Sequence, residues 1–346
     1  MPEAANHDYR HRKYLSAIEA ALFLGVRVQD IHAWVKSGQL SAYTAASGQQ
    51  RFKLTDLQKL RAGNDISPTD QSDTSLTTDQ LHYHCADARN MQTIPDHSVH
   101  LMVTSPPYFD AKMYSESADA DLGNIHDLDQ WFAEMNAVWS EVLRVLAPGR
   151  KAFVNIMNLP VRNGNGGYRT LNLVGRTIDE MENLGFIFKR DIVWHKTNGV
   201  RAHFGTYPNP GGILINNMHE FILEFDTPGG RGAKYAHVSA EDRQASKLDK
   251  DFWLSLKNSD VWLMKPEKSG GRRTHAAPFP LELPARLIRA FSYQNEWVLD
   301  PFAGSGTTLI AALNWHRKAI GYEVNPAIAA EAVKRLQGVL EAGDES

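Results

Sequence analysis

The sequence predicts an α/β fold on a mostly parallel sheet, preceded by a small separate unit. Apolar runs alternate with helical patterns from about residue 81 onward, as parallel α/β folds require. Near the C-terminus a strand, a glycine loop, a helix and a second strand are expected in that order, which is the layout of a βαβ unit. With 346 residues, the chain is long enough for one large domain and one small one.

The expected elements follow one another along three regions: a small unit at 1–62, a linker at 63–80 and the large domain at 81–340. The linker prediction depends on a polar stretch, GNDISPTDQSDTSLTTDQ, that is too poor in apolar residues to pack a core. Apolar residues at helical spacing predict helices at 128–146, ended by Pro148 and Gly149, and at 171–184. Strands are predicted at 81–88, 98–103, 151–157, 186–196, 218–225, 260–264, 296–300 and 318–323.

Composition excludes several classes of protein. The single cysteine, Cys85, rules out an internal disulfide framework and a cysteine-built zinc site, and it suits a reducing cytoplasm. No run of about 18 apolar residues is present, so we expect a soluble cytoplasmic protein with no membrane partner. The formal net charge of -3 means that any nucleic acid must be held by local patches.

A glycine loop, DPFAGSGTT at 300–308, lies between a predicted strand and a predicted helix. Its glycines allow close backbone approach to a ligand, and the free N–H groups of the helix start favour an anionic group. Glu323 follows about 20 residues later, where an acid can accept hydrogen bonds from both ribose hydroxyls. Nicotinamide enzymes and structural turns share these features, but Leu309 replaces the third glycine of the dinucleotide fingerprint, which favours S-adenosylmethionine.

A second motif, TSPPY at 104–108, ends the predicted strand before it. Two consecutive prolines fix the local backbone, so the loop can hold the Ser105 hydroxyl and nearby carbonyl oxygens as acceptors. Tyr108 can stack on an extruded base. Acceptors that bind both hydrogens of an exocyclic amine favour a tetrahedral nitrogen, whose lone pair can attack a sulfonium methyl group. Taken alone, the pentapeptide is equally compatible with a structural Pro-Pro loop.

Together and in this order, the two motifs resemble the beta class of amino-directed DNA methyltransferases over residues 81–338. The resemblance implies a Rossmann-like S-adenosylmethionine-dependent methyltransferase fold in circularly permuted order, acting on double-stranded DNA without a metal. The serine form of the catalytic loop implies cytosine N4 as the target, with adenine N6 as the alternative. An inactive, S-adenosylmethionine-sensing DNA-binding regulator remains the alternative of another class.

The resemblance also implies roles for individual residues. Ser105, Pro106, Pro107 and Tyr108 match the catalytic loop. Asp87 matches the acid that contacts the cofactor adenine, although Ala86 replaces the usual glycine before it; a surface or capping aspartate is the alternative. The residues implied in cofactor binding are Asp87, Thr104, His275, Phe279, Pro280, Asp300, Pro301, Phe302, Ala303, Gly304, Ser305, Gly306, Thr307, Thr308 and Glu323. Cys85, with His84 and Ala86 beside it, does not follow a proline as the nucleophile of cytosine-C5 enzymes does, and we interpret it as a core thiol.

Two regions are candidates for DNA recognition. Residues 14–60 resemble the winged helix-turn-helix of MerR and excisionase-type domains, with a capping box at Ser16 and Glu19, a second helix at 28–36 and a wing at 48–52. A helical packing or dimerisation unit is the alternative. A target-recognition insertion is predicted at about 197–273, with a solvated mixed-charge loop as its alternative. The predicted DNA-binding residues are Arg27, His32, Lys36, Arg201, Arg272 and Arg273. A cognate restriction endonuclease and a homodimer are compatible with this interpretation and stay open.

Overall fold

The computed structural model describes two compact units, which meet in the sequence between Asp73 and Thr74. The described residues are 14–24, 26, 31, 34–35, 39–44, 50–63, 74–107, 109, 122–162, 168–197, 208–212, 215–229, 234–267 and 279–344. None of the described helices is both long enough and apolar enough to cross a membrane.

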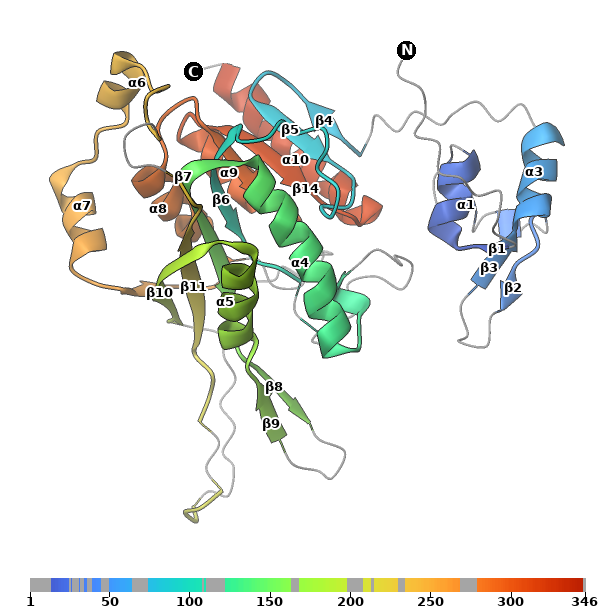
Figure 1. The fold of residues 1–346 in the computed structure, drawn as a ribbon, viewed down its shortest axis with the longest axis horizontal. Helices are drawn as coiled ribbons and strands as arrows, with labels where there is room; N and C mark the ends of the chain where they lie inside the picture. The colour runs from blue at the N-terminus through green and yellow to red at the C-terminus, as the bar shows by residue number, and fades with distance from the viewer. Residues whose placement is uncertain are drawn as a thin grey trace. The chain divides into compact units, whose positions relative to one another are not determined.

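Among its described residues, the N-terminal unit has a three-stranded antiparallel sheet and helices at Ala17–Leu24 and Leu54–Gly63, drawn in blue in Figure 1. The Ser16–Glu19 capping box is confirmed: Ser16 N donates to Glu19 Oε2 at 2.8 Å, and Glu19 N donates to Ser16 Oγ at 3.3 Å. Phe52, at the end of the predicted wing, lies in the central strand of this sheet, pairs with Leu15 and is a fully buried core residue. The elements are β1 (Tyr14–Leu15), α1 (Ala17–Leu24), β2 (Tyr43–Thr44), β3 (Gln50–Lys53) and α3 (Leu54–Gly63).

Much of the predicted helix-turn-helix lies outside the described residues. Ile31, Trp34 and Val35 are helical, which agrees with a second helix at 28–36. Arg27, His32 and Lys36 are not described, so their DNA-binding role stays a prediction.

The large unit is built on a nine-stranded sheet with the order β12-β10-β11-β7-β6-β13-β14-β5-β4. Strands β7, β6, β13, β14 and β5 run parallel to one another, whereas β11 runs antiparallel to both β7 and β10. The strands are β4 (Leu76–Thr77), β5 (Leu81–His84), β6 (Val99–Thr104), β7 (Leu146–Ile156), β10 (Ile187–Lys196), β11 (His219–Asp226), β12 (Val261–Met264), β13 (Trp297–Asp300) and β14 (Lys318–Tyr322).

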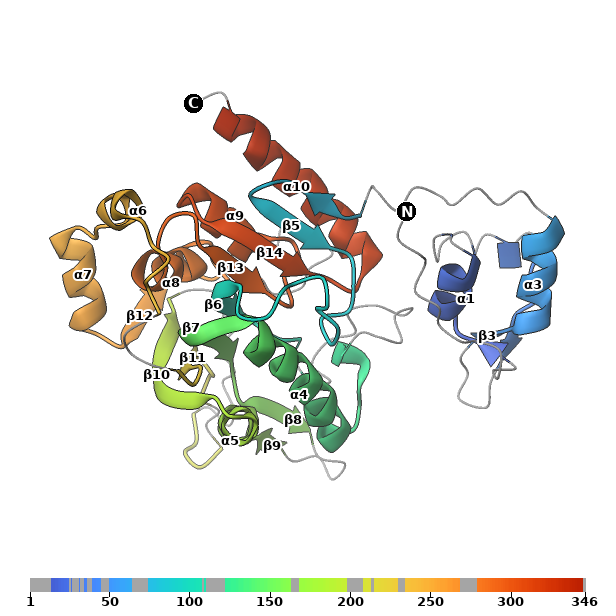
Figure 2. The same cartoon turned by 45° about the horizontal axis from the view of Figure 1, so that its top comes forward.

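Helices cover both faces of this sheet, as Figures 1 and 2 show. α4 (Leu128–Val145) and α5 (Leu173–Leu184) lie on one face, and α8 (Glu282–Phe291) and α9 (Thr307–Asn314) lie on the other. The hairpin of β8 (Leu159–Arg162) and β9 (Tyr168–Leu171) projects from the sheet at the bottom of Figure 1. The remaining described helices are η3 (Leu122–Asn124), α6 (Ala240–Ala245), α7 (Lys250–Lys257) and α10 (Pro326–Asp344).

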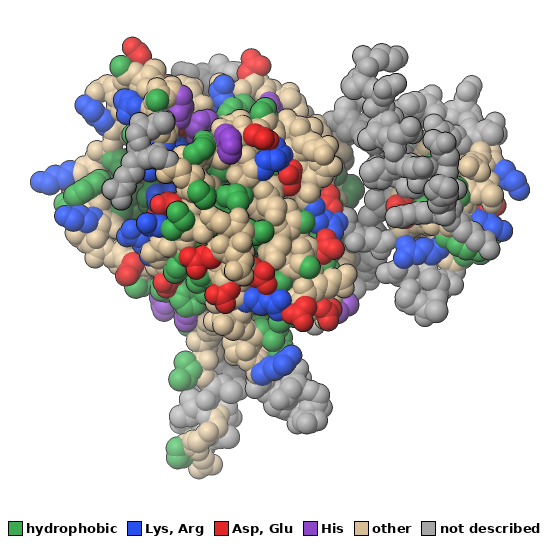
Figure 3. Space-filling model, viewed as in Figure 1, with side chains coloured by type: hydrophobic (Ala, Val, Ile, Leu, Met, Phe, Trp, Pro, Cys, Tyr) green, Lys and Arg blue, Asp and Glu red, His purple; other side chains and the backbone are tan. Residues whose placement is uncertain are grey.

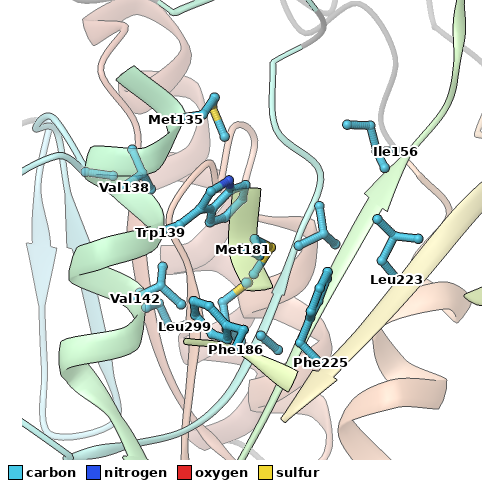
Figure 4. Packing of buried hydrophobic residues seen from close by; sticks show 14 of the residues in the cluster. Met135, Val138, Trp139, Val142, Ile156, Met181, Phe186, Leu223, Phe225 and Leu299 are labelled. Atoms are coloured by element: carbon cyan, nitrogen blue, oxygen red, sulfur yellow. The ribbon is translucent and has the colours of Figure 1, made fainter. Parts of the chain in front are cut away.

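The apolar periodicity of α4 produces the core on its side of the sheet. Met135, Val138, Trp139 and Val142 recur at helical spacing, are all buried, and point toward the strands in Figure 4. The second core, between the sheet and the α8 side, is formed by another set of buried residues. Each face of the sheet therefore has its own core, which is the arrangement of a three-layer α/β domain.

Several predicted boundaries differ from the structure. The linker is shorter than 63–80, because Gly63 still belongs to α3 and β4 pairs antiparallel with β5. The helix before Pro148 ends already at Val145, because Leu146 pairs with Val99 of β6 and so begins a strand. The strand predicted at 81–88 ends at His84, followed by bends and turns. The insertion predicted at 197–273 is also too broad, because β11 lies within it and pairs with β7 inside the sheet.

Candidate active site

Parallel pairing brings the two predicted motifs to the same edge of the sheet. β6 and β13 are neighbours, with Leu101 opposite Val298 and Met102 opposite Leu299. The TSPPY segment follows β6, and the glycine loop follows β13. In parallel α/β sheets, ligands bind at the carboxyl ends of the strands. The structure thus places both motifs where a ligand site is expected.

Asp300, the last residue of β13, is the polar centre of this edge. Its carboxylate is 2% exposed and accepts hydrogen bonds from three groups. Thr104 Oγ1 donates to Oδ1 at 2.6 Å, Thr308 Oγ1 donates to Oδ2 at 2.6 Å, and Phe302 N donates to Oδ1 at 3.0 Å. Both carboxylate oxygens therefore have partners, and these partners come from the end of β6, the glycine loop and the first turn of α9.

Burial has the largest effect on the pKa of the Asp300 carboxyl. Removal from water raises the pKa of its carboxyl to about 6, although the hydrogen bonds from Thr104, Thr308 and Phe302 act in the opposite direction. Near neutral pH the group is therefore largely ionised, but it takes up a proton under mildly acidic conditions.

The glycine loop has the backbone geometry that its sequence predicts. Gly304 has φ of +51° and Gly306 has φ of +82°, a region that side chains with a Cβ rarely adopt. Gly306 is the residue before α9, and the first N–H groups of a helix lack intrahelical partners. The donor set and the open backbone fit the carboxylate end of an amino-acid-bearing nucleoside such as S-adenosylmethionine.

Two residues that the sequence analysis did not identify hold this loop. The Tyr83 hydroxyl donates to Gly304 O at 2.9 Å, and burial raises the pKa of this phenol. Arg335 Nη1 lies 3.1 Å from Ser305 O, 3.3 Å from Ser305 Oγ and 3.2 Å from Thr307 Oγ1. Tyr83 precedes the loop by more than 200 residues and Arg335 lies on a later amphipathic helix, so no local pattern could have assigned either contact.

Close packing of α9 on the sheet is achieved by a glycine outside the motif. A Cβ on Gly321 of β14 would lie 2.7 Å from Leu309 Cδ2 and 2.9 Å from Ala303 Cβ. Leu309 is the residue that replaces the third glycine of the dinucleotide fingerprint. The Leu309 side chain on α9 therefore fits against the sheet because Gly321 on β14 has no side chain.

Glu323 lies directly after β14, the strand next to β13. Its N–H donates to His84 O at 3.0 Å, and its Oε1 accepts a hydrogen bond from Asn325 N at 2.7 Å. The Tyr322 ring before it stacks on the His84 ring with centroids 4.8 Å apart. These contacts fix the backbone of Glu323 at the end of β14, next to the strand that leads into the glycine loop; its role as the ribose-binding acid stays a prediction.

Asp87 is bound within its own loop. Its Oδ1 accepts from Arg89 N at 2.9 Å, and the carboxylate forms an ion pair with the Arg89 side chain, which also pairs with Glu134. The capping alternative is thus present in the structure. One-third of the Asp87 side chain is still exposed, at 34%, so a ligand contact remains compatible with this geometry.

Only part of the catalytic loop is described. Ser105 and Pro107 are half-buried, and Pro106 between them is buried. Phe279 and Pro280, directly before α8, are buried as well. In the large unit, the predicted site residues that lie outside the described part of the chain are Tyr108, Arg201, Arg272, Arg273 and His275.

Cys85 is half-buried and packs against the core on the α8 side. Burial raises the pKa of its thiol to about 11, so the thiolate is scarce at neutral pH. This agrees with the prediction that Cys85 is no nucleophile.

Figure 3 shows Lys and Arg interspersed with Asp and Glu on one face of the large unit, as expected from the net charge.

Comparisons with known proteins agree with this geometry. A family model described as DNA methylase, of the N6/N4 methyltransferase type, matches residues 99–334. The chain is 33% identical over 272 residues to the type II methyltransferase M.MjaI of Methanocaldococcus jannaschii, covering 70% of this chain and 86% of that protein. It is 30% identical over 289 residues to M.MthZI of Methanothermobacter thermautotrophicus, covering 78% and 79%.

Two solved structures are similar as well. A putative DNA modification methylase from Thermus thermophilus, complexed with S-adenosyl-L-methionine, is 34% identical with a TM-score of 0.60, covering 76% of this chain and 94% of that one. The cytosine-N4-specific PvuII DNA methyltransferase is 20% identical with a TM-score of 0.56, covering 75% and 87%, and so shares the fold.

Proposed function

The chain belongs to the N6/N4 DNA methylase family, and from that premise we propose that it methylates the exocyclic N4 amine of cytosine in DNA, with S-adenosyl-L-methionine as methyl donor. The observation that carries this proposal is the direct bond between the two motifs. Thr104 Oγ1 donates to Asp300 Oδ1, so the loop that presents Ser105 is attached to the loop that fits the cofactor.

The residues of the chain have distinct tasks in this reaction. The helix start at Thr307 and the open backbone of the glycine loop orient the anionic end of the cofactor, and Glu323 accepts hydrogen bonds from its ribose. Bound S-adenosyl-L-methionine supplies an electrophilic sulfonium methyl group. Ser105 and the carbonyl oxygens of the proline-fixed loop accept hydrogens from the target amine and hold its lone pair in line. No covalent bond between protein and base is needed.

The choice of cytosine N4 rests on the serine at position 105, which is the form of the catalytic loop that the resemblance associates with this base. Adenine N6 is the second candidate, because the same acceptors fit either amine.

The sheet order supports a permuted chain, because β13, near the C-terminus, lies between β6 and β14. The N-terminal unit, as a winged helix-turn-helix, would bind double-stranded DNA. We also propose a cognate restriction endonuclease as a partner, because the chain is similar to type II methyltransferases.

One experiment tests the activity and the base together. The protein is incubated with S-adenosyl-L-methionine and unmethylated genomic DNA, the DNA is digested to nucleosides, and methylated bases are identified by mass spectrometry. We expect N4-methylcytosine. N6-methyladenine would overturn the base assignment but keep the reaction, whereas no methylated base together with S-adenosyl-L-methionine binding would favour the regulator.

A further inference from the structure

Four neighbouring strands place a row of polar residues next to the catalytic loop. β6, β7, β11 and β10 are consecutive in the sheet. β11 is antiparallel to its neighbours, so its first residues lie at the edge where the other three end. Ser105 follows β6, Asn155 is near the end of β7, Glu220 is near the start of β11, and Lys196 ends β10.

Asn155 stands beside Ser105 in this row. Thr104 of β6 pairs with Val154 of β7. Ser105 and Asn155 are the next residues after this pair on their respective segments. Side chains alternate between the faces of a strand, and Phe153 belongs to the core on the α8 side. Asn155 therefore shares that face with Phe153.

The row is held together by a buried carboxylate. Asn155 is 2% exposed, and its Nδ2 donates to Glu220 Oε2 at 2.5 Å. Lys196 Nζ lies 2.5 Å from Glu220 Oε1. An ionised carboxylate can only accept hydrogen bonds. Glu220 therefore orients the amide of Asn155 with its nitrogen toward Glu220 and its oxygen, Oδ1, away from Glu220. This oxygen is buried and has no hydrogen-bond partner in the described part of the chain.

A fixed, buried carbonyl without a donor is unfavourable in a protein on its own, and such atoms are rare. Asn155 lies beside the residue that we assign to the target amine. We propose that Asn155, Glu220 and Lys196 form the site that reads the edge of the target base. In this site Asn155 Oδ1 accepts one of the two amine hydrogens while the Ser105 loop accepts the other, and Lys196 Nζ donates to the adjacent ring nitrogen. The inference rests on the proposed function.

This pattern matches the chemistry that cytosine and adenine have in common. Each base presents an amine next to a ring nitrogen that accepts a hydrogen bond, N4 beside N3 in cytosine and N6 beside N1 in adenine. Guanine and thymine present a carbonyl oxygen beside a ring N–H, which would meet an acceptor and a donor in the wrong order. The site therefore selects amine-bearing bases and leaves the choice between them to the shape around the ring.

The molecule contains a matched control for this site. Lys151 Nζ lies 2.5 Å from Glu224 Oε1 and 2.7 Å from Asp226 Oδ1, on the same two strands that carry Asn155 and Glu220 but at the opposite edge of the sheet. Lys151 and Lys196 have equally exposed side chains, both at 18%, and Glu224 and Glu220 are similarly buried. A purely structural role for Lys196 predicts the same behaviour for both pairs.

The experiment compares wild type, Lys196→Met and Lys151→Met on two DNA duplexes that contain the mapped methylation site. In one duplex the ring nitrogen beside the target amine is replaced by C–H, as 3-deazacytosine or, for an adenine target, 1-deazaadenine. We expect wild type to lose about 10- to 100-fold in kcat/KM on this duplex, the range of a hydrogen bond to a charged group. Lys196→Met should show that loss already on natural DNA and little further loss on the analogue, whereas Lys151→Met should behave as wild type.

Asn155→Ala tests the acceptor separately. We expect a lower kcat at an unchanged affinity for S-adenosyl-L-methionine, because Asn155 acts on the amine and not on the cofactor. An unchanged kcat, equal wild-type rates on the two duplexes, or equal losses in the two lysine variants would each overturn the inference while the methyltransferase activity stands. If the wild type transfers no methyl group to any DNA, the proposed function fails first and this inference with it.

Discussion

Thr104 and Asp300 are 196 positions apart, yet a 2.6 Å hydrogen bond joins their side chains at the centre of the sheet edge. Thr104 is fully buried and Asp300 nearly so. A bond between two buried groups transmits a displacement of one loop to the other, because neither side chain can turn to water instead. Cofactor binding and the position of Ser105 are therefore expected to be coupled.

Replacing Thr104 with valine removes the donor at nearly constant volume. We expect S-adenosyl-L-methionine binding to become less favourable by roughly 1 to 3 kcal/mol, because the buried Asp300 Oδ1 loses one of its hydrogen-bond donors. The measurement is the affinity for S-adenosyl-L-methionine by calorimetry together with the single-turnover methylation rate. Thr170→Val on the exposed face of β9 serves as the control. An unchanged affinity and rate in Thr104→Val would contradict the coupling.

Asp300 makes the stability depend on pH. Folding raises its carboxyl pKa from 3.8 to about 6, so its favourable contribution is complete below pH 4 and is lost as the pH rises through 6. Above that pH, the buried ionised group destabilises the fold by roughly 3 kcal/mol. We expect the melting temperature of Asp300→Asn, relative to wild type, to increase between pH 4 and pH 7.

The control for this titration is Asp129→Asn, whose parent side chain is 85% exposed and hydrated whether the chain is folded or not. Thermal melts at several pH values give the difference for each variant. A difference between Asp300→Asn and wild type that does not change with pH would show that Asp300 is not the titrating group.

Gly321 and Gly338 form a second matched pair. Gly321→Ala would place a Cβ within 3 Å of Leu309 and Ala303, and we expect a loss of about 1 to 3 kcal/mol in unfolding free energy. Gly338→Ala on α10 has nothing within 4 Å and should stabilise the helix by about 0.5 to 1 kcal/mol. Chemical denaturation measures both. Equal effects of the same sign would mean that α9 has room to move away from the sheet.

The guanidinium of Arg335 contacts the glycine loop at Ser305 and the start of α9 at Thr307. We expect Arg335→Met to weaken S-adenosyl-L-methionine binding by about tenfold, since hydrogen bonds to a charged group contribute about 1.5 to 3 kcal/mol. Lys334→Met, the exposed neighbour, is the control and should bind as wild type. Isothermal titration calorimetry measures this affinity. A tenfold loss would show that Arg335 supports the glycine loop, whereas an unchanged affinity would show that it only covers the loop.

The sequence predicted the two motifs and their strands because each signal is local. Apolar runs, paired prolines and spaced glycines determine backbone conformation within a few residues, so Asp300 and Ser105 could be placed at strand ends. Arg335 and Asn155 could not be assigned, because their roles depend on strand order and on which face of the sheet each side chain occupies. The end of α4 at Val145 was missed for a related reason: pairing of Leu146 with β6 outweighs local helical spacing.

The position of β13 has a consequence for synthesis of the protein. This strand joins β6 to β14, yet Trp297–Asp300 leaves the ribosome only after most of the chain has been made. Until then, β6 has an open edge at the centre of the future sheet, and unpaired edges favour association with other chains. A product that ends before residue 297 therefore lacks the central strand that connects the two halves of the sheet.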